Sequence, residues 1–191
     1  MIRTTRTNVD VAITASDEEL MAAVRGGARA PFEQLFDRYR RAVWGFFRRR
    51  VQDPGAAEDL VQNVFTALLD AAPRYRAQGA FRSYLFGIAF NVLQAERRRQ
   101  LSRATSPLDD ELPDAHVVDA DRALWVRAAL AQLDPDEREL VMLREYEGLS
   151  YQEIADLRQL PLNTVRSRLF RARMALRALL TPDVEIEEQS R

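Results

Sequence analysis

The segment Asn163–Arg173, which reads NTVRSRLFRAR, carries the side chains of this sequence that are best suited to contact nucleic acid. It packs four arginines into eleven residues and contains no acidic residue. A guanidinium group is always charged, and it presents a planar fork of donors that fits phosphate oxygens and the edge of guanine. We therefore expect this segment to contact a DNA duplex.

The apolar residues between these arginines recur at helical spacing. Separations of four and three residues run through Val165, Leu169, Ala172, Leu176 and Leu179. This stripe predicts a helix that Asn163 caps, that ends near Leu180 and that buries its apolar side. The residues expected to face the bases are Arg166, Ser167, Phe170 and Arg171, and those expected near phosphates are Thr164, Arg168 and Arg173. The alternative is an amphipathic surface helix whose arginines are only solvated.

A shorter helix is predicted directly before this one. Ser150 and Glu153 form a capping box, and the helical pattern breaks from Gln159 to Leu162. A short capped helix, a turn and a longer basic helix are the layout of a helix-turn-helix, whose second helix enters the major groove. This layout and the outward Phe170 favour DNA binding over a solvated surface helix.

A second basic surface is predicted on the helix that runs from Phe81 to about Arg99. The residues expected on its outer side are Asn91, Gln94, Arg97 and Arg98. Amide and guanidinium groups suit base edges and phosphates. In the preceding loop, Tyr75 lies beside Arg76, and an aromatic ring among arginines suits stacking on unpaired bases. Phe81 and Phe86 are expected in the core instead.

The segment AAEDLVQNVFTALL carries a polar face of a different kind. This face is formed by Asp59, Gln62, Asn63 and Thr66 at helical spacing, and it contains no base. It is therefore not a DNA surface. It is either solvated or docks a helix of another protein, and the spacing alone does not choose between these.

Signals at the ends of other helices organise the rest of the chain. The expected starts are Ser16 with Glu19, Pro31, Asp53 before Pro54, and Asp134 with Glu137, and the expected stops are Gly26-Gly27 and Gly148. No segment has the alternating pattern of a strand. We predict an all-α fold of two small helical modules, a three- to four-helix bundle and a helix-turn-helix.

The predicted boundaries follow the composition. Residues 1–15 form a mobile tail, 16–100 the first module, 101–120 a flexible acidic linker, 121–180 the second module and 181–191 an acidic tail. A linker of 20 residues reaches at most roughly 66–72 Å. Two turns of B-DNA cover roughly 70 Å, so the two modules can read sites separated by that length.

Composition excludes several classes of protein. The net charge of −1 averages over arginine runs, at Arg48–Arg50 and Arg97–Arg99, and the acidic linker. The absence of cysteine excludes disulfides, thiolate zinc sites and cysteine nucleophiles. No apolar run approaches the roughly 20 residues of a membrane span, which predicts a cytoplasmic protein without membrane insertion. No nucleotide-binding glycine motif is present, and we expect no cofactor.

Taken together, these stretches resemble the extracytoplasmic-function (ECF) group of bacterial sigma factors. AEDLVQNVF resembles the segment that binds the clamp helices of RNA polymerase, and FRSYLFGIAFNVLQAERRR the helix that reads and opens the downstream promoter element. EGLSYQEIA with NTVRSRLFRAR resembles the helix-turn-helix that reads the upstream element. The resemblance covers roughly residues 20–100 and 122–180, and its three motifs stand in the family's order.

The resemblance implies a promoter-specificity subunit whose partners are core RNA polymerase, promoter DNA and an anti-sigma protein. The residues implied for polymerase binding are Asp59, Leu60, Gln62, Asn63, Phe65 and Thr66. The residues implied for the downstream element and its melting are Tyr75, Arg76, Asn91, Gln94, Arg97 and Arg98. Those implied for the upstream element are the seven residues named above, from Thr164 to Arg173.

The sequence departs from the family's pattern at several positions. The departing residues are Asn63, where an acid is common, Tyr84, where tryptophan is usual, Ala95, where aspartate is common, and Asn163, which replaces a common glycine. Arg158-Gln159 replaces the usual Leu-Gly of the helix-turn-helix turn. Because that turn usually takes glycine, its replacement leads us to expect a different backbone geometry there.

Two other functions remain as alternatives at this stage. The first is an autonomous helix-turn-helix regulator whose first module is a sensor, and such a protein would bind duplex promoter tightly without polymerase. The second is an enzyme. The chain's single histidine, His116, lies in the predicted linker, and its carboxylate pairs have no evident cleft, so we do not expect catalysis.

Overall fold

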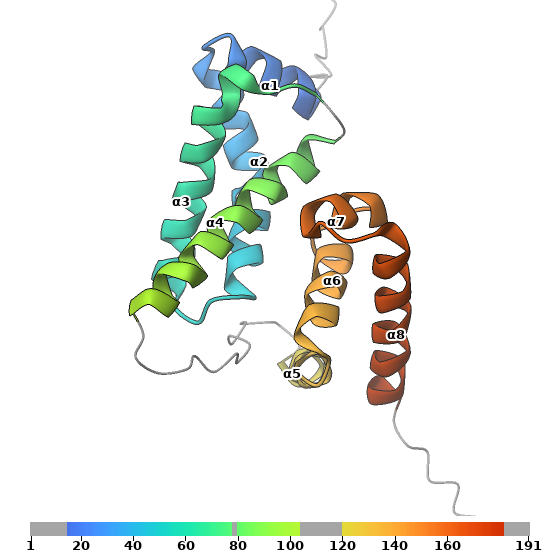
Figure 1. Cartoon of the computed structure of the whole chain (residues 1–191). Helices are drawn as coiled ribbons and strands as arrows, with labels where there is room; N and C mark the ends of the chain where they lie inside the picture. Colours follow the sequence, from blue (N-terminus) through green and yellow to red (C-terminus); the bar gives the residue numbers. More distant parts are fainter. Residues whose placement is uncertain (1–14, 78–79, 104–119, 182–191) are drawn as a thin grey trace, which may run out of the picture.

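A computed structural model describes residues 15–77, 80–103 and 120–181, and within these ranges the chain is entirely helical (Figure 1). The elements are α1 (Asp17–Arg25), α2 (Arg29–Arg48), α3 (Pro54–Ala71), a 3₁₀ turn η1 (Ala72–Arg74), α4 (Phe81–Arg103), α5 (Ala120–Ala131), α6 (Pro135–Glu145), α7 (Tyr151–Arg158) and α8 (Leu162–Leu180). The predicted N-terminal tail, the acidic tail and the linker with His116 fall almost wholly outside the described residues.

Most of the predicted helix starts are confirmed. Ser16 and Ser150 each accept a hydrogen bond from a backbone N–H three residues on, and the glutamate there closes the capping box. Asp53 accepts from two backbone N–H groups at the start of α3. Local capping chemistry therefore fixes these ends, as expected from sequence.

Two predicted starts are wrong. Helix α2 begins at Arg29, so that Pro31 lies within its first turn, where a missing N–H costs nothing. Helix α8 begins at Leu162 with Pro161 at the N-cap, and the Pro161 carbonyl accepts from the N–H groups of Thr164 and Val165. Asn163 is an exposed residue of the first turn and not the cap.

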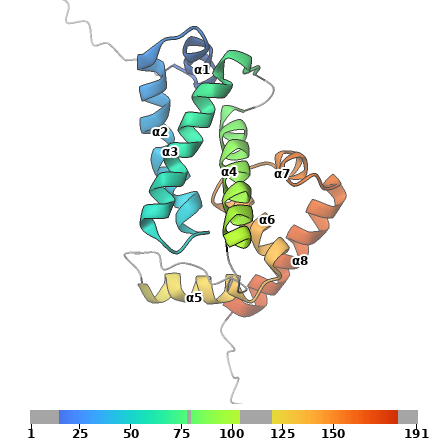
Figure 2. The same cartoon turned by 60° about the vertical axis from the view of Figure 1, so that its left-hand side comes forward.

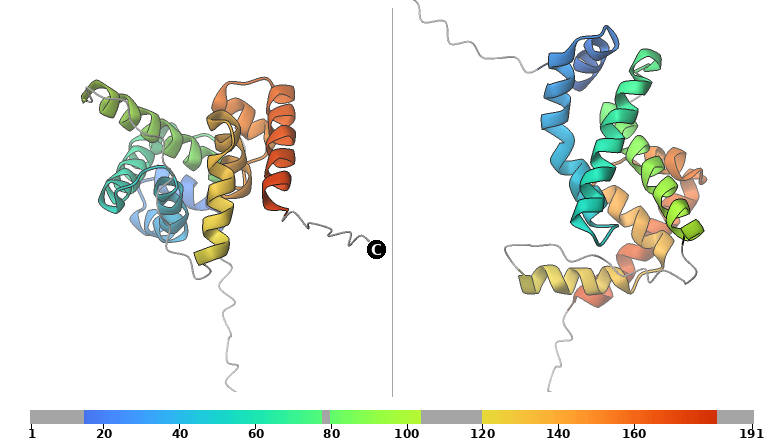
Figure 3. Two further views of the ribbon diagram at one scale, coloured as in Figure 1. Left: turned by 90° about the horizontal axis from the view of Figure 1, so that it is seen from below. Right: turned by 90° about the vertical axis from the view of Figure 1, so that its left-hand side faces the viewer.

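Helices α1–α4 form the first module. Helix α2 packs against α1 and α3, and α3 packs against α4, as the views in Figures 1 and 3 show. Aromatic pairs fill the interior: Phe36 meets Phe65 at 4.7 Å between ring centres, and Tyr39 meets Phe81 at 5.5 Å. Phe81 and Phe86 are buried, which confirms the prediction that they belong to the core.

Helices α5–α8 form the second module. Helix α8 packs against α6, α7 and α5, and Val165, Leu169 and Ala172 of its predicted stripe are fully buried. Helix α5 runs across the lower end of the molecule as drawn in Figure 2. Helix α8 lies on the outer side of this module, away from the first module (Figures 1 and 2).

The two modules also touch each other directly, which the sequence did not predict. Buried apolar residues of both modules belong to one continuous cluster. Helix α7 lies beside α4, and α6 lies beside the end of α2. In the described part of the chain, the two modules therefore pack against each other.

Candidate nucleic-acid interface

The turn between α7 and α8 sets the direction of the predicted recognition helix. Gln159 adopts a left-handed conformation, with φ 51° and ψ 44°. The N–H of Leu160 bonds to the carbonyl of Ala155 at 2.9 Å, and the N–H of Gln159 to that of Asp156 at 3.3 Å. These are the two bonds of a Schellman motif, which usually uses glycine. The expectation of a different geometry was wrong, because the chain keeps the glycine conformation with a glutamine.

The outer side of α8 presents an apolar ring between guanidinium groups. Phe170 is 64% exposed, although burying such a ring would be favourable. Arg166 and Ser167 are exposed one turn earlier, and the Ser167 hydroxyl donates to the Thr164 carbonyl. Arg166 makes no ion pair with any described residue and is free to contact DNA.

The other three arginines of the segment Asn163–Arg173 are held by carboxylates. Arg171 donates to Glu137 at 2.9–3.0 Å, and Arg168 donates to Asp136 at 3.2 Å. Both acids belong to the first turn of α6. The Asp136 carboxylate also accepts from Arg158 at 3.0 Å. These arginines are thereby oriented, and each must exchange a carboxylate for a phosphate or a base to bind DNA.

Arg173 is held further along the helix. It donates to Glu145 at 2.8 Å and to the Tyr151 hydroxyl at 2.6 Å. The bond to Glu145, and then the bond to Tyr151, raise the pKa of Arg173 above its ordinary value. Asp134 caps α6 as predicted, but the Glu137 carboxylate does not bond back to it within the described part of the chain and accepts from Arg171 instead.

The outer side of α4 carries the second predicted DNA surface. Asn91 and Arg98 are exposed, whereas Gln94 and Arg97 are half-buried. These four residues lie on one continuous helix that extends to Arg103. The structure therefore places them on a single rigid element.

The loop before α4 differs from its prediction. Tyr75 is 6% exposed, and its ring packs against Tyr84 at 4.9 Å and Phe81 at 6.3 Å. Burial raises the pKa of the Tyr75 hydroxyl. The ring is part of the core here and is not an open platform for bases, whereas Arg74 and Arg76 on either side are exposed.

Helix α3 carries the face predicted to dock a protein. Asp59, Gln62, Asn63 and Thr66 are all exposed along it. Leu60 and Phe65 are only 3% exposed, so they support this face from beneath and do not contact a partner in this conformation. Their apolar periodicity placed them in the core, and the family resemblance outweighed that signal.

A hollow of about 460 Å³ adjoins this face. Its walls are formed by Phe36, Arg40, Arg41, Trp44, Glu58, Val61 and Gln62. Trp44 is 41% exposed. Its position could not be predicted, because the helical spacing of this segment indicates only which residues are buried. Tryptophan is enriched among the residues that contribute most to binding at protein interfaces.

Sequence reasoning also missed a buried cluster of charges between the modules. Arg50 at the end of α2 is 2% exposed in its side chain, and it donates to Glu139 of α6 at 3.0 Å and to Glu147 at 3.2 Å. Arg49 donates to the same oxygen of Glu147 at 3.0 Å. The sequence signal for this cluster is the run Arg48–Arg50 alone, because the carboxylates that pair with it lie some 90 residues further along the chain.

The described residues hold no group of side chains that could ligate a metal ion. Within the same ranges, no helix is both long and apolar enough to cross a membrane. The features that remain are an arginine-rich helix-turn-helix and a helical bundle with separate basic and polar faces. They define a two-module DNA-binding protein with a further surface for a protein partner.

Comparison with known proteins places this architecture. Residues 35–103 match sigma-70 region 2, and residues 123–176 match sigma-70 region 4. The chain belongs to the sigma-70 family of RNA polymerase sigma factors, in its ECF group. The comparisons do not favour an autonomous regulator.

Individual relatives agree with this assignment. The RNA polymerase sigma-H factor of Pseudomonas aeruginosa is 32% identical over 185 residues, covering 87% of this chain and 94% of that protein. The ECF sigma factor SigC of Mycobacterium tuberculosis is 34% identical over 182 residues, covering 89% and 96%. The solved structure of CnrH in complex with the cytosolic domain of CnrY has a TM-score of 0.64 at 27% identity, covering 88% and 99%.

Proposed function

We propose that this sigma factor divides promoter recognition and polymerase binding among three helices. Helix α8 reads the upstream element, α4 reads the downstream element, and the polar face of α3 docks on core polymerase. The observation that carries the proposal is the exposed side of α8, where an unpaired Arg166 and a 64% exposed Phe170 lie together.

The upstream assignment follows from the chemistry of these groups. A guanidinium group bonds guanine through two donors, and an apolar ring contacts the methyl group of thymine. Arg166, Ser167, Phe170 and Arg171 are therefore assigned to base edges. Thr164, Arg168 and Arg173 are assigned to phosphates, since they lie toward the edges of the buried stripe.

The downstream assignment combines a reading helix with a basic loop. Asn91, Gln94 and Arg98 are assigned to the bases of the downstream element, and Arg97 to its phosphate backbone. Arg76 lies in the exposed loop, which is placed to neutralise the phosphates of a separated strand. Extruding a base costs a few kcal/mol, and contacts with polymerase and phosphates offset this cost. Tyr75 takes part only if its ring leaves the core.

Polymerase binding is assigned to the exposed residues of α3, which are Asp59, Gln62, Asn63 and Thr66, with Leu60 and Phe65 as their buried support. Trp44 and its hollow extend this surface. The protein supplies specificity to polymerase and no catalytic chemistry of its own. Its place of action is accordingly the cytoplasm, where polymerase meets the chromosome.

An anti-sigma protein is the proposed regulator. One solved neighbour contains such a partner, the sigma factor RpoE of Bartonella quintana with the anti-sigma factor NepR, and CnrH was solved in complex with the cytosolic domain of CnrY. At 24% identity, the likeness to RpoE concerns the fold alone. A partner of this kind would compete with polymerase for the first module or hold the two modules apart from DNA.

Transcription in vitro with core polymerase on a promoter library tests the assignments. Arg171→Ala is expected to weaken use of the upstream element and to leave binding of core polymerase intact. Glu33→Ala, an exposed change on α2, serves as the matched control. Equal transcription by the unaltered protein from matched and mutated upstream elements would contradict the assignment of α8.

A further inference from the structure

The first turn of α1 reaches across the first module to the start of the helix assigned to the downstream element. The carboxylate of Glu18 accepts a hydrogen bond from the backbone N–H of Phe81 at 3.1 Å, although 63 residues separate the two along the chain. Phe81 is the first residue of α4, and the first turn of α4 contains no acidic residue of its own. Glu18 therefore supplies, from another helix, the acceptor that a capping side chain usually supplies from its own segment.

A carboxylate suits this position. The first four N–H groups of a helix have no partner within it, and the helix dipole places partial positive charge there. A hydrogen bond from such a donor to a charged acceptor is stronger than a neutral one. The bond between Glu18 and Phe81 is also part-buried, so water competes for it less than at an open helix end. The bond therefore fixes the place where α4 begins.

Phe81 is also held through its ring. Its side chain is 1% exposed, and the ring centre lies 5.5 Å from that of Tyr39 in α2 and 6.3 Å from that of Tyr75 in the loop before α4. The Tyr39 hydroxyl in turn donates to the carboxylate of Asp17. Two neighbouring acids of α1 thus act on the same residue of α4, Glu18 on its backbone and Asp17 through the Tyr39 ring.

The loop next to this contact is the basic one assigned to a separated strand. Helix α1 packs against η1, which precedes the loop, and against α4, which follows it. Figure 1 shows α1 at the end of the module where the chain passes from α3 to α4. Burial, and then the charge of Glu18, raise the pKa of the Tyr75 hydroxyl, so the carboxylate also lies near the start of the loop. One helix therefore positions both ends of the loop.

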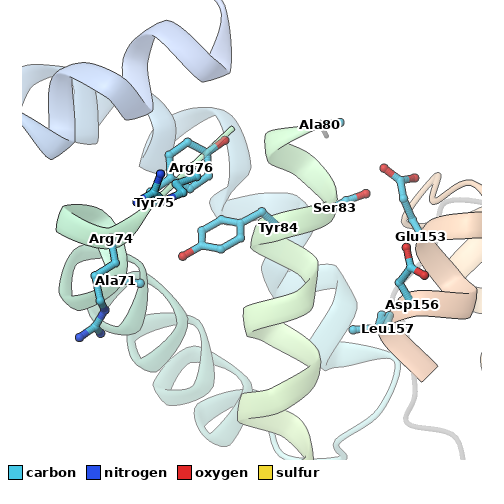
Figure 4. A pocket seen from close by; sticks show the side chains of 10 residues that line it. All are labelled: Ala71, Arg74, Tyr75, Arg76, Ala80, Ser83, Tyr84, Glu153, Asp156 and Leu157. Atoms are coloured by element: carbon cyan, nitrogen blue, oxygen red, sulfur yellow. The ribbon is translucent and has the colours of Figure 1, made fainter. Parts of the chain in front are cut away.

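The side chains suited to DNA project from these two ends. Arg74 and Arg76 are exposed on the side of the loop. Tyr84 lies in the first turn of α4, and its ring centre is 4.9 Å from that of Tyr75. Figure 4 shows these side chains lining a hollow of about 540 Å³, which α7 borders on its other side. A shift in the start of α4 would change the spacing between the loop and the helix.

Promoter opening depends on groups that are already in place. Separating the strands costs free energy, which contacts with the extruded bases and the phosphates must return. These contacts return less when the loop must first be ordered, because ordering a segment costs conformational entropy. A residue that orders the loop in the free protein therefore favours opening.

We propose that Glu18 is a positioning residue for promoter opening, which fixes the start of α4 and the basic loop by accepting from the Phe81 N–H. The role in opening rests on the proposed function of the first module, whereas the bond itself does not. Glu18 acts through Phe81 and not by contact with DNA. Its negative charge repels phosphates, so its contribution lies in the bond and not in the charge.

Promoter opening by the reconstituted polymerase complex tests this role. Permanganate reactivity of unpaired thymines measures opening, and retention of the same duplex at low temperature, where it stays closed, measures binding. Glu18→Ala is expected to reduce the equilibrium constant for opening about 10-fold, which is the effect of losing one charge-assisted cap. Affinity for core polymerase and for the upstream element should stay unchanged. A merely structural role would instead lower binding and opening together.

Two further variants separate the bond from the charge and from the stability of α1. Glu18→Gln keeps an oxygen that accepts from the Phe81 N–H, so it should restore most of the lost opening. Glu19→Ala removes the capping box with Ser16 in the same turn, so it weakens α1 but leaves the acceptor of Phe81 in place, and it should reduce opening much less.

Three results of this comparison would overturn the proposal. The first is an unchanged opening constant in Glu18→Ala. The second is a rise in both Glu18 variants, which would show that the carboxylate acts by repelling DNA. The third is an equal loss in Glu18→Ala and Glu19→Ala, which would show that only the stability of α1 matters.

Hydrogen exchange in the free protein distinguishes failure of the bond from failure of the proposed function. The Phe81 amide should exchange about 10-fold faster in Glu18→Ala than in the unaltered protein, and at nearly the unaltered rate in Glu19→Ala. Unchanged exchange in Glu18→Ala would refute the bond whatever polymerase does. Faster exchange in a protein that never binds polymerase would refute the proposed function, and with it the role in opening, and would leave the bond standing.

Discussion

The arginines of α8 and those at the end of α2 give the same signal in the sequence and have opposite environments in the structure. On α8, Arg166 and Arg171 are exposed. Among the described residues Arg166 makes no ion pair, and Arg171 pairs with Glu137 of its own module. At the end of α2, Arg50 is 2% exposed and pairs with carboxylates of the other module. A run of arginines therefore identifies a binding surface only when its burial and its partners are known.

The difference has an energetic consequence. An exposed arginine exchanges water for a phosphate or a base at little cost, whereas a buried one requires its carboxylate to stay in place. The α8 arginines are thus suited to a partner that comes and goes. The α2 arginines are suited to hold two parts of one chain together.

The largest effect is expected from the buried side of this comparison. Arg50→Ala leaves Glu139 and Glu147 with one fewer buried partner. We expect the free energy of unfolding to fall by about 3–5 kcal/mol. Urea denaturation followed by circular dichroism measures this loss. Arg40→Ala, within α2 and in a long 3.7 Å surface pair, should change stability by less than about 0.5 kcal/mol. Equal losses in the two variants would remove the distinction.

The next effect concerns the exposed side. Arg166→Ala should cost about 1–3 kcal/mol of discrimination between the matched upstream element and a mutated one, if Arg166 bonds a guanine. Arg173→Ala should weaken binding to the matched and to the mutated upstream element equally, because a phosphate contact carries no sequence information. Binding of the polymerase complex to both DNAs at fixed salt measures the two cases. An equal loss of affinity for both DNAs in Arg166→Ala would show that Arg166 contacts the DNA backbone and not a base.

A smaller gain is expected in the turn that orients the recognition helix. Gln159→Gly relieves a left-handed conformation that costs a side chain about 1–2 kcal/mol, less the entropy that glycine loses. The net stabilisation should be about 0.5–1 kcal/mol in thermal unfolding of the full chain. Gln152→Gly within α7 should instead destabilise by a similar amount. A destabilised Gln159→Gly protein would show that the glutamine side chain contributes more than the strain.

The smallest effect is expected from the surface pair of Glu137 with Arg171. Glu137→Gln frees the Arg171 guanidinium group, whose side chain is 63% exposed, so affinity for the upstream element should rise by no more than about 1 kcal/mol. The same change in the presence of Arg171→Ala should have no effect on affinity. An equal rise in both backgrounds would show that Glu137 acts by repelling DNA and not through Arg171.

Features set by neighbouring residues could be predicted from the sequence. The capping boxes at Ser16 and Ser150 and the apolar stripe of α8 depend on residues three or four positions apart. Both boxes are confirmed, and the stripe is buried from Val165 to Ala172 and half-buried at Leu176 and Leu179. The family assignment and the all-helical fold also follow from such local patterns, and the comparisons confirm both.

Features set by distant residues could not be predicted. Tyr75 was expected to face solvent, but its ring is buried by Phe81 and Tyr84 once the loop folds back on α4. The partners of Arg50 lie 89 and 97 residues further along the chain. No periodicity within one segment encodes either contact, because each depends on how the helices pack.

Transcription reconstituted from core polymerase, promoter DNA and this protein tests the central claim most directly. The account predicts that core polymerase alone starts at few defined sites, and that adding the protein produces transcripts from promoters sharing two elements about two helical turns apart. It also predicts that the protein co-purifies with core polymerase. A protein that neither co-purifies with core polymerase nor changes where transcription starts would contradict the assignment.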